Sequence, residues 1–329
     1  MPIFRVICDM RKFIEFVKLS RFYAALTTAL LPVYGALSTG MNLGAIQLLV
    51  LFLIGLLGHV WGFILNDYAD MKVDKLLKID KPLIVGTISK KEAITWSISC
   101  VTIAFLLVLI FFRHPLPIAI LGISGILGCV YCFFSKRAPG LEIFASLSFS
   151  IFCLFGSVVV SLSIPLLSIV IFFFVFVQQL FENGIIGGLK DCGHDSLVGK
   201  TTVLNMGAAL LAGKMFKIPK KLKIYIYLLR GMHLLALLAW FIVLYLIHGY
   251  FNIFLIILTT FFMIILIHTT RKFVNNPTIK MFSRFILIHI IICYHVVIPI
   301  MLYPFIGVYT ILLMIIPYIW HASFGQLLK

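Results

Sequence analysis

The sequence predicts an all-α, polytopic membrane protein with about nine transmembrane helices in one bundle and cytoplasmic cap loops. Composition is the first reason: 62% of the 329 residues are hydrophobic and 12% are charged, whereas soluble domains carry about 25% charged residues. The second reason is that the apolar residues form continuous runs, which excludes the alternating pattern of a membrane β-barrel. The third is that basic residues are confined to alternate loops, as is typical of a multi-pass chain.

The chain opens with residues 1–21, which mix Phe and Val with Arg and Lys. This pattern is typical of an amphipathic helix at the membrane interface, and the segment lacks the features of a secretory signal. Nine apolar spans follow, each near the roughly 20 residues that cross the hydrocarbon. They cover 22–39, 46–65, 94–112, 116–134, 142–162, 164–185, 222–247, 251–268 and 284–302. A stretch at 305–321 is a candidate short tenth element. No linker divides the chain, so we expect a single domain over 1–329.

The basic residues predict the orientation of these spans. The net charge of +16 would indicate nucleic-acid binding in a soluble protein. Here, 24 of the 27 Lys and Arg residues fall in segments that nine spans place on one side of the membrane. These segments are 1–21, 66–92, 135–141, 187–223 and 269–284. The positive-inside rule puts them and the N-terminus in the cytoplasm, and we expect no nucleic-acid partner.

The acidic residues are concentrated at two of these cytoplasmic loops. Six of the 11 acids lie in the windows 67–80 and 191–195. In the first window, Asp67, Asp70 and Asp74 are spaced by three and four residues, so a continuing helix would stack them on one face, with Asn66 beside them. In the second window, Asp191 and Asp195 are four residues apart. Carboxylates at the ends of apolar helices indicate a functional site.

Hard oxygen ligands on both sides of a gap favour Mg²⁺, which shares its coordination with phosphate oxygens. The predicted metal ligands are Asn66, Asp67, Asp70, Asp74, Asp191 and Asp195. Lys81 follows the first acid cluster, and Lys190 and Lys200 flank the second; lysine is a compact phosphate binder. The alternatives are a solvated helix end with local salt bridges, and an acidic transport pathway, although relay carboxylates usually lie in the middle of a span.

The two acidic motifs resemble those of the UbiA superfamily of intramembrane prenyltransferases. The first cluster, beginning at Asn66-Asp67, matches that family's N-D-x-x-D-x-x-x-D motif, and Asp191 with Asp195 matches its second motif, D-x-x-x-D. The run from Asp80 to Gly86 is similar to the family's D-R-P-containing segment, with Lys81 in place of arginine. The nine-span architecture agrees across the whole chain.

Other stretches agree less uniformly with the family. The run from Tyr131 to Lys136-Arg137 resembles its Y-x-x-x-x-K-R motif. Arg21-Phe22 stands where many members have Arg-Pro. Gly187 and Gly188 stand where many members carry a basic and an acidic residue. These departures leave the branch of the family open.

The resemblance implies a Mg²⁺-dependent transfer of a prenyl group from a prenyl diphosphate to a lipophilic, aromatic acceptor within the membrane. It implies catalytic roles for Asp67, Asp70 and Asp191. The implied diphosphate-binding residues are Asn66, Lys81, Arg137, Lys190 and Lys200. Apolar helices would exclude water from the allylic cation, and Tyr131 is a candidate to face that cation. His59, two turns before Asp67, is expected to be a buried, hydrogen-bonded histidine. Two alternatives stay open: a membrane terpene cyclase on the same scaffold, and a non-catalytic lipid or ion carrier.

Overall fold

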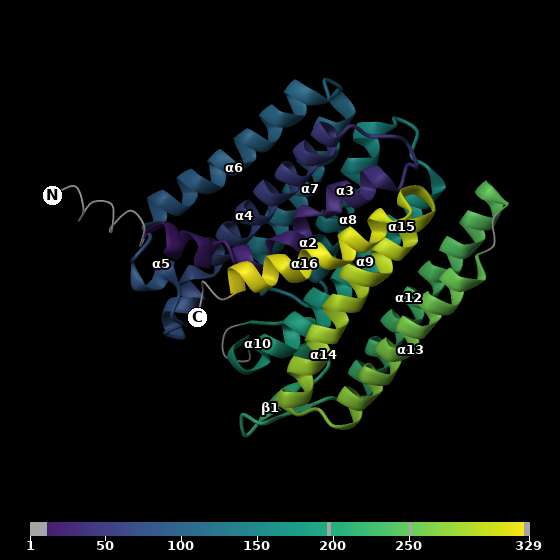
Figure 1. Cartoon of the computed structure of the whole chain (residues 1–329). Coiled ribbons are helices and arrows are strands. Elements are labelled where there is room, and N and C mark those ends of the chain that lie inside the picture. The colour runs from purple at the N-terminus through teal and green to yellow at the C-terminus, as the bar shows by residue number, and fades with distance from the viewer. Residues whose placement is uncertain (1–11, 196–198, 250–251, 326–329) are drawn as a thin grey trace.

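The computed structural model describes residues 12–195, 199–249 and 252–325, which form a bundle of long helices (Figure 1). Within this part of the chain, eight helices are long and apolar enough to cross a membrane. Many large apolar side chains on the outside of the bundle are exposed, among them Ile126, Leu246 and Phe254. Such a surface is stable only against hydrocarbon. The protein is therefore an integral, multi-pass membrane protein with an all-α fold, as the composition predicts.

Residues 12–19, within the predicted interfacial segment, are helical. The first predicted span then consists of three short helical segments, η1 (Phe22–Ala24), α2 (Ala25–Ala29) and α3 (Leu31–Leu37). Pro32 lies in the first turn of α3, where its missing N–H costs no hydrogen bond. The second span, α4 (Ala45–Leu76), runs well beyond the predicted apolar stretch and carries the first acid cluster. The short α5 (Pro82–Val85) and then α6 (Lys90–Phe111) complete the first third of the chain.

The middle of the chain carries the second acidic motif on a continuation of the sixth span. α7 (Pro115–Phe134) and α8 (Glu142–Val160) precede α9 (Leu166–Phe181). A π-helical segment, η2 (Glu182–Gly187), joins α9 to α10 (Gly188–Asp195). After it come α11 (Thr202–Asn205) and an antiparallel hairpin of β1 (Ala209–Leu211) and β2 (Met215–Lys217), with Leu210 opposite Phe216. The loop predicted at 187–223 is thus a structured cap on this end of the bundle.

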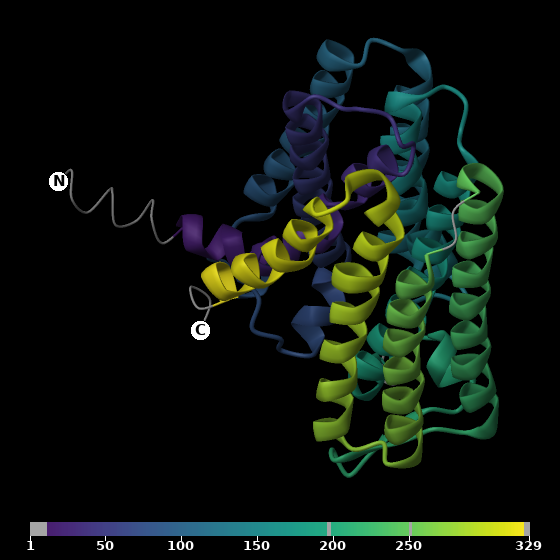
Figure 2. The ribbon, with the colours of Figure 1, turned by 45° about the vertical axis from the view of Figure 1, so that its right-hand side comes forward.

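The last third contains two long antiparallel helices and a second π-helical segment. α12 (Lys220–His248) and α13 (Ile253–Asn275) are followed by α14 (Ile279–Ile292), η3 (Cys293–Val297) and α15 (Ile298–Ile306). The predicted ninth span lies within the run from α14 to α15. The candidate tenth element is α16 (Tyr309–Gly325), a shorter apolar helix. Figure 2 shows α16, in yellow, turning away from the other helices of this third and running back toward the start of the chain.

The core depends on close contacts between helix backbones. Gly35 on α3 and Gly156 on α8 face each other's helices: a Cβ on Gly35 would lie 1.7 Å from the carbonyl oxygen of Cys153, and a Cβ on Gly156 would lie 1.8 Å from that of Pro32. Neither helix has room for a methyl group there. Small residues at helix crossings let backbones approach closely in membrane proteins, and these two glycines therefore set the spacing of α3 and α8.

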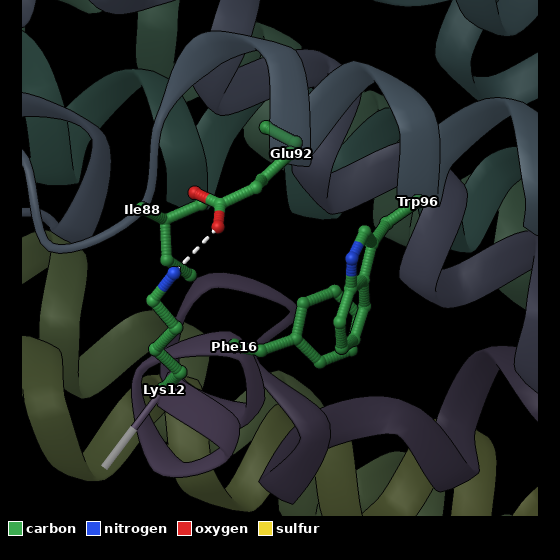
Figure 3. A pocket seen from close by; sticks show the side chains of 6 residues that line it. Lys12, Phe16, Ile88, Glu92 and Trp96 are labelled. Carbon is green, nitrogen blue, oxygen red and sulfur yellow. Dashed lines mark hydrogen bonds and ion pairs between the residues drawn. The ribbon is translucent and has the colours of Figure 1, made fainter. Parts of the chain in front are cut away.

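The N-terminal helix packs on α6 at the edge of the bundle. Lys12 Nζ lies 2.7 Å from Glu92 Oε1, and the Phe16 ring contacts Trp96, so that these side chains line a small pocket with Ile88 and Ala93 (Figure 3). Phe16 also packs against a small core cluster that includes Leu19 and Ile64 of α4. The N-terminal segment is thereby tied to α6 and to α4, the helix that carries the first acid cluster.

Candidate active site at the end of α4

Three carboxylates share one face of α4 near its end. Because α4 continues to Leu76, the three- and four-residue spacing of Asp67, Asp70 and Asp74 stacks them, as predicted. The side chains of Asp67 and Asp74 are each 4% exposed, and that of Asp70 is 16% exposed. Carboxylates this buried and this close together require cations between them.

Lys81 supplies one of these cations. Its Nζ lies 2.9 Å from Asp67 Oδ1 and 2.7 Å from Asp74 Oδ2, so a single ammonium bridges two of the three carboxylates. Burial by itself lowers the pKa of Lys81, but the carboxylates of Asp67 and Asp74 outweigh that effect and raise it above its ordinary value. The ammonium therefore stays charged at neutral pH.

The local sequence explains how Lys81 reaches the acids. Lys81 is the extended residue before α5, with φ −125° and ψ 149°, and Pro82 fixes the first helical position. α5 is short because Gly86 adopts a left-handed conformation, with φ 84°, and ends it. The chain thus turns back beneath α4 and points Lys81 at the face that carries the carboxylates.

Two further basic residues pair with the same face. Arg21 Nη2 lies 3.2 Å from Asp67 Oδ1, and the Arg21 guanidinium lies over the Phe63 ring at 4.8 Å. Lys136, in the loop after α7, lies 3.3 Å from Asp70 Oδ2. Residues that are distant in the sequence therefore surround the first acid cluster with positive charge.

The second acidic motif lies on α10, close to this cluster. Figure 1 shows α5 at the left edge of the bundle and α10 below its centre. The backbone N–H of Lys200 donates to the carbonyl oxygen of Lys136, the residue that pairs with Asp70, at 3.0 Å. Tyr131 lies within electrostatic reach of both Asp70 and Asp191. The loop after the second motif is therefore bonded to the loop that serves the first.

The other predicted residues differ in their surroundings. Asp191, Lys190 and Lys200 are exposed, and Asn66 is half-buried beside Asp67. Arg137 is exposed and its guanidinium lies over the Phe134 ring at 4.5 Å, whereas its neighbour Lys136 reaches the acids. The side chain of Asp195 lies outside the part of the chain that the structure describes.

The donor chemistry of this site fits a divalent cation bound together with an anion. Among the described residues, no three metal-ligating side chains converge on one point. However, Asp67 and Asp74 already form a two-carboxylate cation site, which the Lys81 ammonium occupies. Hard carboxylate oxygens of this kind suit Mg²⁺, and the surrounding Arg21, Lys81 and Lys136 suit phosphate oxygens. Metal and ammonium would compete for the same oxygens.

His59 is part of the frame of the site. Its Nε2 donates to the carbonyl oxygen of Arg21 at 3.3 Å, since that oxygen can only accept. Its Nδ1 must then accept from the Thr28 hydroxyl, 3.1 Å away. The structure thus places His59 as a buried, hydrogen-bonded histidine that holds the backbone at Arg21.

A second buried polar group, missed by sequence reasoning, lies within the apolar spans. Arg230 on α12 is 2% exposed; its Nε donates to Thr270 Oγ1 at 3.0 Å and its Nη2 to His289 Nδ1 at 2.8 Å. The guanidinium lies over the Phe181 ring at 3.9 Å. A charged residue inside an apolar span was the only sequence signal for this group. It joins α12 to α9, α13 and α14.

The chain is similar to known prenyltransferases in sequence and in fold. The model of the UbiA prenyltransferase family matches residues 24–291. The 4-hydroxybenzoate octaprenyltransferase of Saccharophagus degradans is 32% identical over 110 residues, which cover 32% of this chain and 36% of that protein. The digeranylgeranylglyceryl phosphate synthase of Thermococcus sibiricus is 33% identical over 93 residues, covering 28% of this chain and 33% of that protein. The chain thus spans about a third of the length of the curated relatives it matches.

Solved structures show the same fold over nearly the whole chain. A structure of a digeranylgeranylglyceryl phosphate synthase has a TM-score of 0.66 at 17% identity, covering 91% of this chain and 100% of that one. A UbiA homologue from Archaeoglobus fulgidus, bound to GPP and Mg²⁺, has a TM-score of 0.57 at 17% identity, covering 95% of this chain and 99% of that one. The arrangement of the helices is therefore shared, although the sequences have diverged widely.

Proposed function

The chain belongs to the UbiA prenyltransferase family, and from this premise we propose that it transfers a prenyl group from a prenyl diphosphate to a lipophilic acceptor within the membrane. The observation that carries the proposal is the row of three carboxylates on α4, interleaved with Arg21, Lys81 and Lys136. Such a site neutralises an anion and a metal together. The relatives whose sequences match are named as prenyltransferases, and a homologous structure binds GPP and Mg²⁺.

The proposed metal ligands are Asn66, Asp67, Asp70 and Asp74 on α4 and Asp191 and Asp195 of the second acidic motif. When bound, Mg²⁺ would neutralise the diphosphate and stabilise the charge that builds on its leaving oxygen. Asp67 and Asp74 are buried and nearly dry, so they offer preorganised oxygens rather than solvated ones.

The basic residues have a separate role in the proposal. Lys81, Arg21 and Lys136 would bind diphosphate oxygens and hold the leaving group at the end of the bundle, with Lys190, Lys200 and Arg137 at its exposed side. The prenyl chain would lie among the apolar helices above, where water is excluded and an allylic cation is protected from hydrolysis. The acceptor's displaced proton would leave toward the polar end of the bundle.

The proposal is tested by changing single carboxylates in the purified full chain. Asp70→Ala and Asp191→Ala should each abolish release of diphosphate from geranylgeranyl diphosphate in Mg²⁺, because each removes a metal ligand while leaving the helix packing intact. Glu92→Gln is the matched control, since Glu92 is an exposed acid that pairs with Lys12 away from the carboxylate row, and it should retain activity. Near-normal turnover by Asp70→Ala or Asp191→Ala would refute the metal site.

Product analysis separates the transferase from its alternatives. A transferase gives a product in which the prenyl chain is joined to the acceptor, with 4-hydroxybenzoate as the first acceptor to try. A terpene cyclase gives a cyclic hydrocarbon or alcohol with no acceptor present. A lipid or ion carrier releases no diphosphate at all, and that result would overturn the proposed function.

A further inference from the structure

The C-terminal helix α16 lies beyond residues 24–291, the part of the chain that the family shares, yet it contacts the start of the first span. Trp320 Nε1 donates to the carbonyl oxygen of Phe22 at 2.9 Å. The Trp320 ring lies 5.1 Å from the Phe22 ring and 4.7 Å from that of Phe324, and Phe324 also contacts Phe22. In Figure 2, α16 ends beside the helix at the start of the chain.

The residue before Phe22 has an unfavourable backbone conformation. Arg21 has φ 47° and ψ 43°, in the left-handed region that residues with a Cβ rarely adopt. Neighbouring contacts must hold it there. His59 donates to the carbonyl oxygen of Arg21 from α4, and Trp320 donates to the next carbonyl oxygen, that of Phe22, from α16. Two successive carbonyl oxygens are therefore bound by side chains of two different helices.

This conformation determines where the Arg21 side chain lies. With the backbone so turned, the guanidinium lies over the Phe63 ring and reaches Asp67 Oδ1, the same oxygen that Lys81 contacts. Arginine offers two parallel N–H groups to an oxyanion, which a lysine cannot do. Arg21 is thus placed at the acidic site by a contact of His59 to its own carbonyl oxygen and by a contact of Trp320 to the carbonyl oxygen of the next residue, Phe22.

We propose that Trp320 is a positioning residue for the diphosphate site: through its hydrogen bond to Phe22 it holds Arg21 in the left-handed conformation that brings the guanidinium to Asp67. This inference rests on the proposed function, because it assigns Arg21 to the binding of a prenyl diphosphate. It gives α16 a role in supporting the site, although none of the hydrogen bonds and ring contacts described for this helix reaches the carboxylates. The helix acts on the affinity for diphosphate and not on the chemical step.

A double-mutant cycle tests the coupling in the full chain purified in detergent. Trp320→Phe keeps an aromatic ring against Phe22 and Phe324 but removes the N–H donor. Its affinity for magnesium inorganic diphosphate, measured by titration calorimetry, should fall about two- to tenfold, as expected for one lost hydrogen bond. Arg21→Gln should also weaken binding, and Trp320→Phe should have no further effect in that background. Ile319→Ala, at a 59% exposed position on the same helix, is the control and should bind normally.

Two results would overturn the coupling. One is unchanged diphosphate affinity in Trp320→Phe. The other is an equal loss of affinity with and without Arg21, since Trp320 would then act by another route. If Trp320 only stabilised the fold, its loss would lower the melting temperature without changing diphosphate affinity.

A measurement without ligand separates this inference from the proposed function. If the wild-type chain bound no magnesium diphosphate, the proposed function would fail. The melting temperatures of the metal-free single and double variants would still decide whether Trp320 and Arg21 are coupled. If Trp320 and Arg21 are coupled, the decrease in melting temperature of the double variant differs from the sum of the decreases of the two single variants. A decrease equal to that sum would reject the coupling.

Discussion

Lys81 shows how a single residue changes the interpretation of the acid cluster. Lysines in loops beside membrane spans are common simply because cytoplasmic loops are basic. Lys81 differs because its ammonium bridges Asp67 and Asp74 and is only 21% exposed. Its raised pKa means that its stabilising contribution is fully present below the ordinary lysine pKa and is lost only as the pH rises through the raised value. The bridge is therefore intact throughout the physiological range.

Substitution of Lys81 should act on the use of prenyl diphosphate. Lys81→Met removes a charge-assisted contact worth roughly 1.5–3 kcal/mol, so we expect about a ten- to hundredfold loss in kcat/KM for prenyl diphosphate. Lys81→Arg keeps the charge and should remain active. The measurement is steady-state kinetics with prenyl diphosphate varied at saturating Mg²⁺. Unchanged kinetics in Lys81→Met would show that Lys81 is only one more basic residue of a cytoplasmic loop.

The relative placement of the helices depends on features that the helix propensities of the residues do not predict. α3 and α8 cross with Gly35 and Gly156 against each other's backbones. The π-helical segments η2 and η3 each insert an extra residue into a turn, which re-aims the side chains that follow. In η2 this change of register comes just before Asp191, so the segment helps to determine where the second acidic motif points.

The crossing of α3 and α8 predicts the effect of adding one methyl group. Gly156→Ala would place its Cβ against the Pro32 carbonyl oxygen, a backbone atom that cannot move without separating the helices. We expect the free energy of unfolding to fall by about 1–3 kcal/mol, which would be measured as a lower melting temperature in detergent. Gly122→Ala is the matched control, because nothing lies within 4 Å of a Cβ there. A melting temperature for Gly156→Ala equal to that of the control would contradict the close packing.

In the whole molecule, the charged residues are distributed unequally between the two ends of the bundle. Asp70 lies on α4, Asp191 lies on α10, and Lys136 lies in the basic loop that follows α7. If the basic loops face the cytoplasm, the proposed diphosphate site opens on that side. The opposite end of the bundle carries few charges and would face the other compartment.

Labelling of single cysteines tests this orientation. In a chain without its native thiols, cysteines at Lys78 and at Lys217 should both react with a membrane-impermeant reagent from the cytoplasmic side, because both follow the acidic helices on the same end of the bundle. A cysteine at Asn42 should react only from the other side. Labelling of positions 78 and 217 from opposite sides would break the argument that the two acidic motifs form one site.

The sequence by itself determined the class of fold, the order of the spans and the acidic face of α4. These properties are local: continuous apolar runs partition into hydrocarbon, and the spacing of Asp67, Asp70 and Asp74 stacks them wherever the chain is helical. The motifs also led to the family. The spans came out close to their predicted positions, apart from the helical breaks around α2 and α3 and the extensions of α4 and of the sixth span.

Only the tertiary structure decided which charges meet. Lys136 and Arg137 are neighbours in the loop that begins after α7 ends at Phe134. Lys136 nevertheless pairs with Asp70, whereas the guanidinium of Arg137 lies over the exposed Phe134 ring. Arg21 reaches Asp67 because His59 and Trp320, far along the chain, hold the adjacent backbone. Arg230 finds its partners on other helices. Such contacts depend on how distant segments pack, which spacing within one segment does not encode.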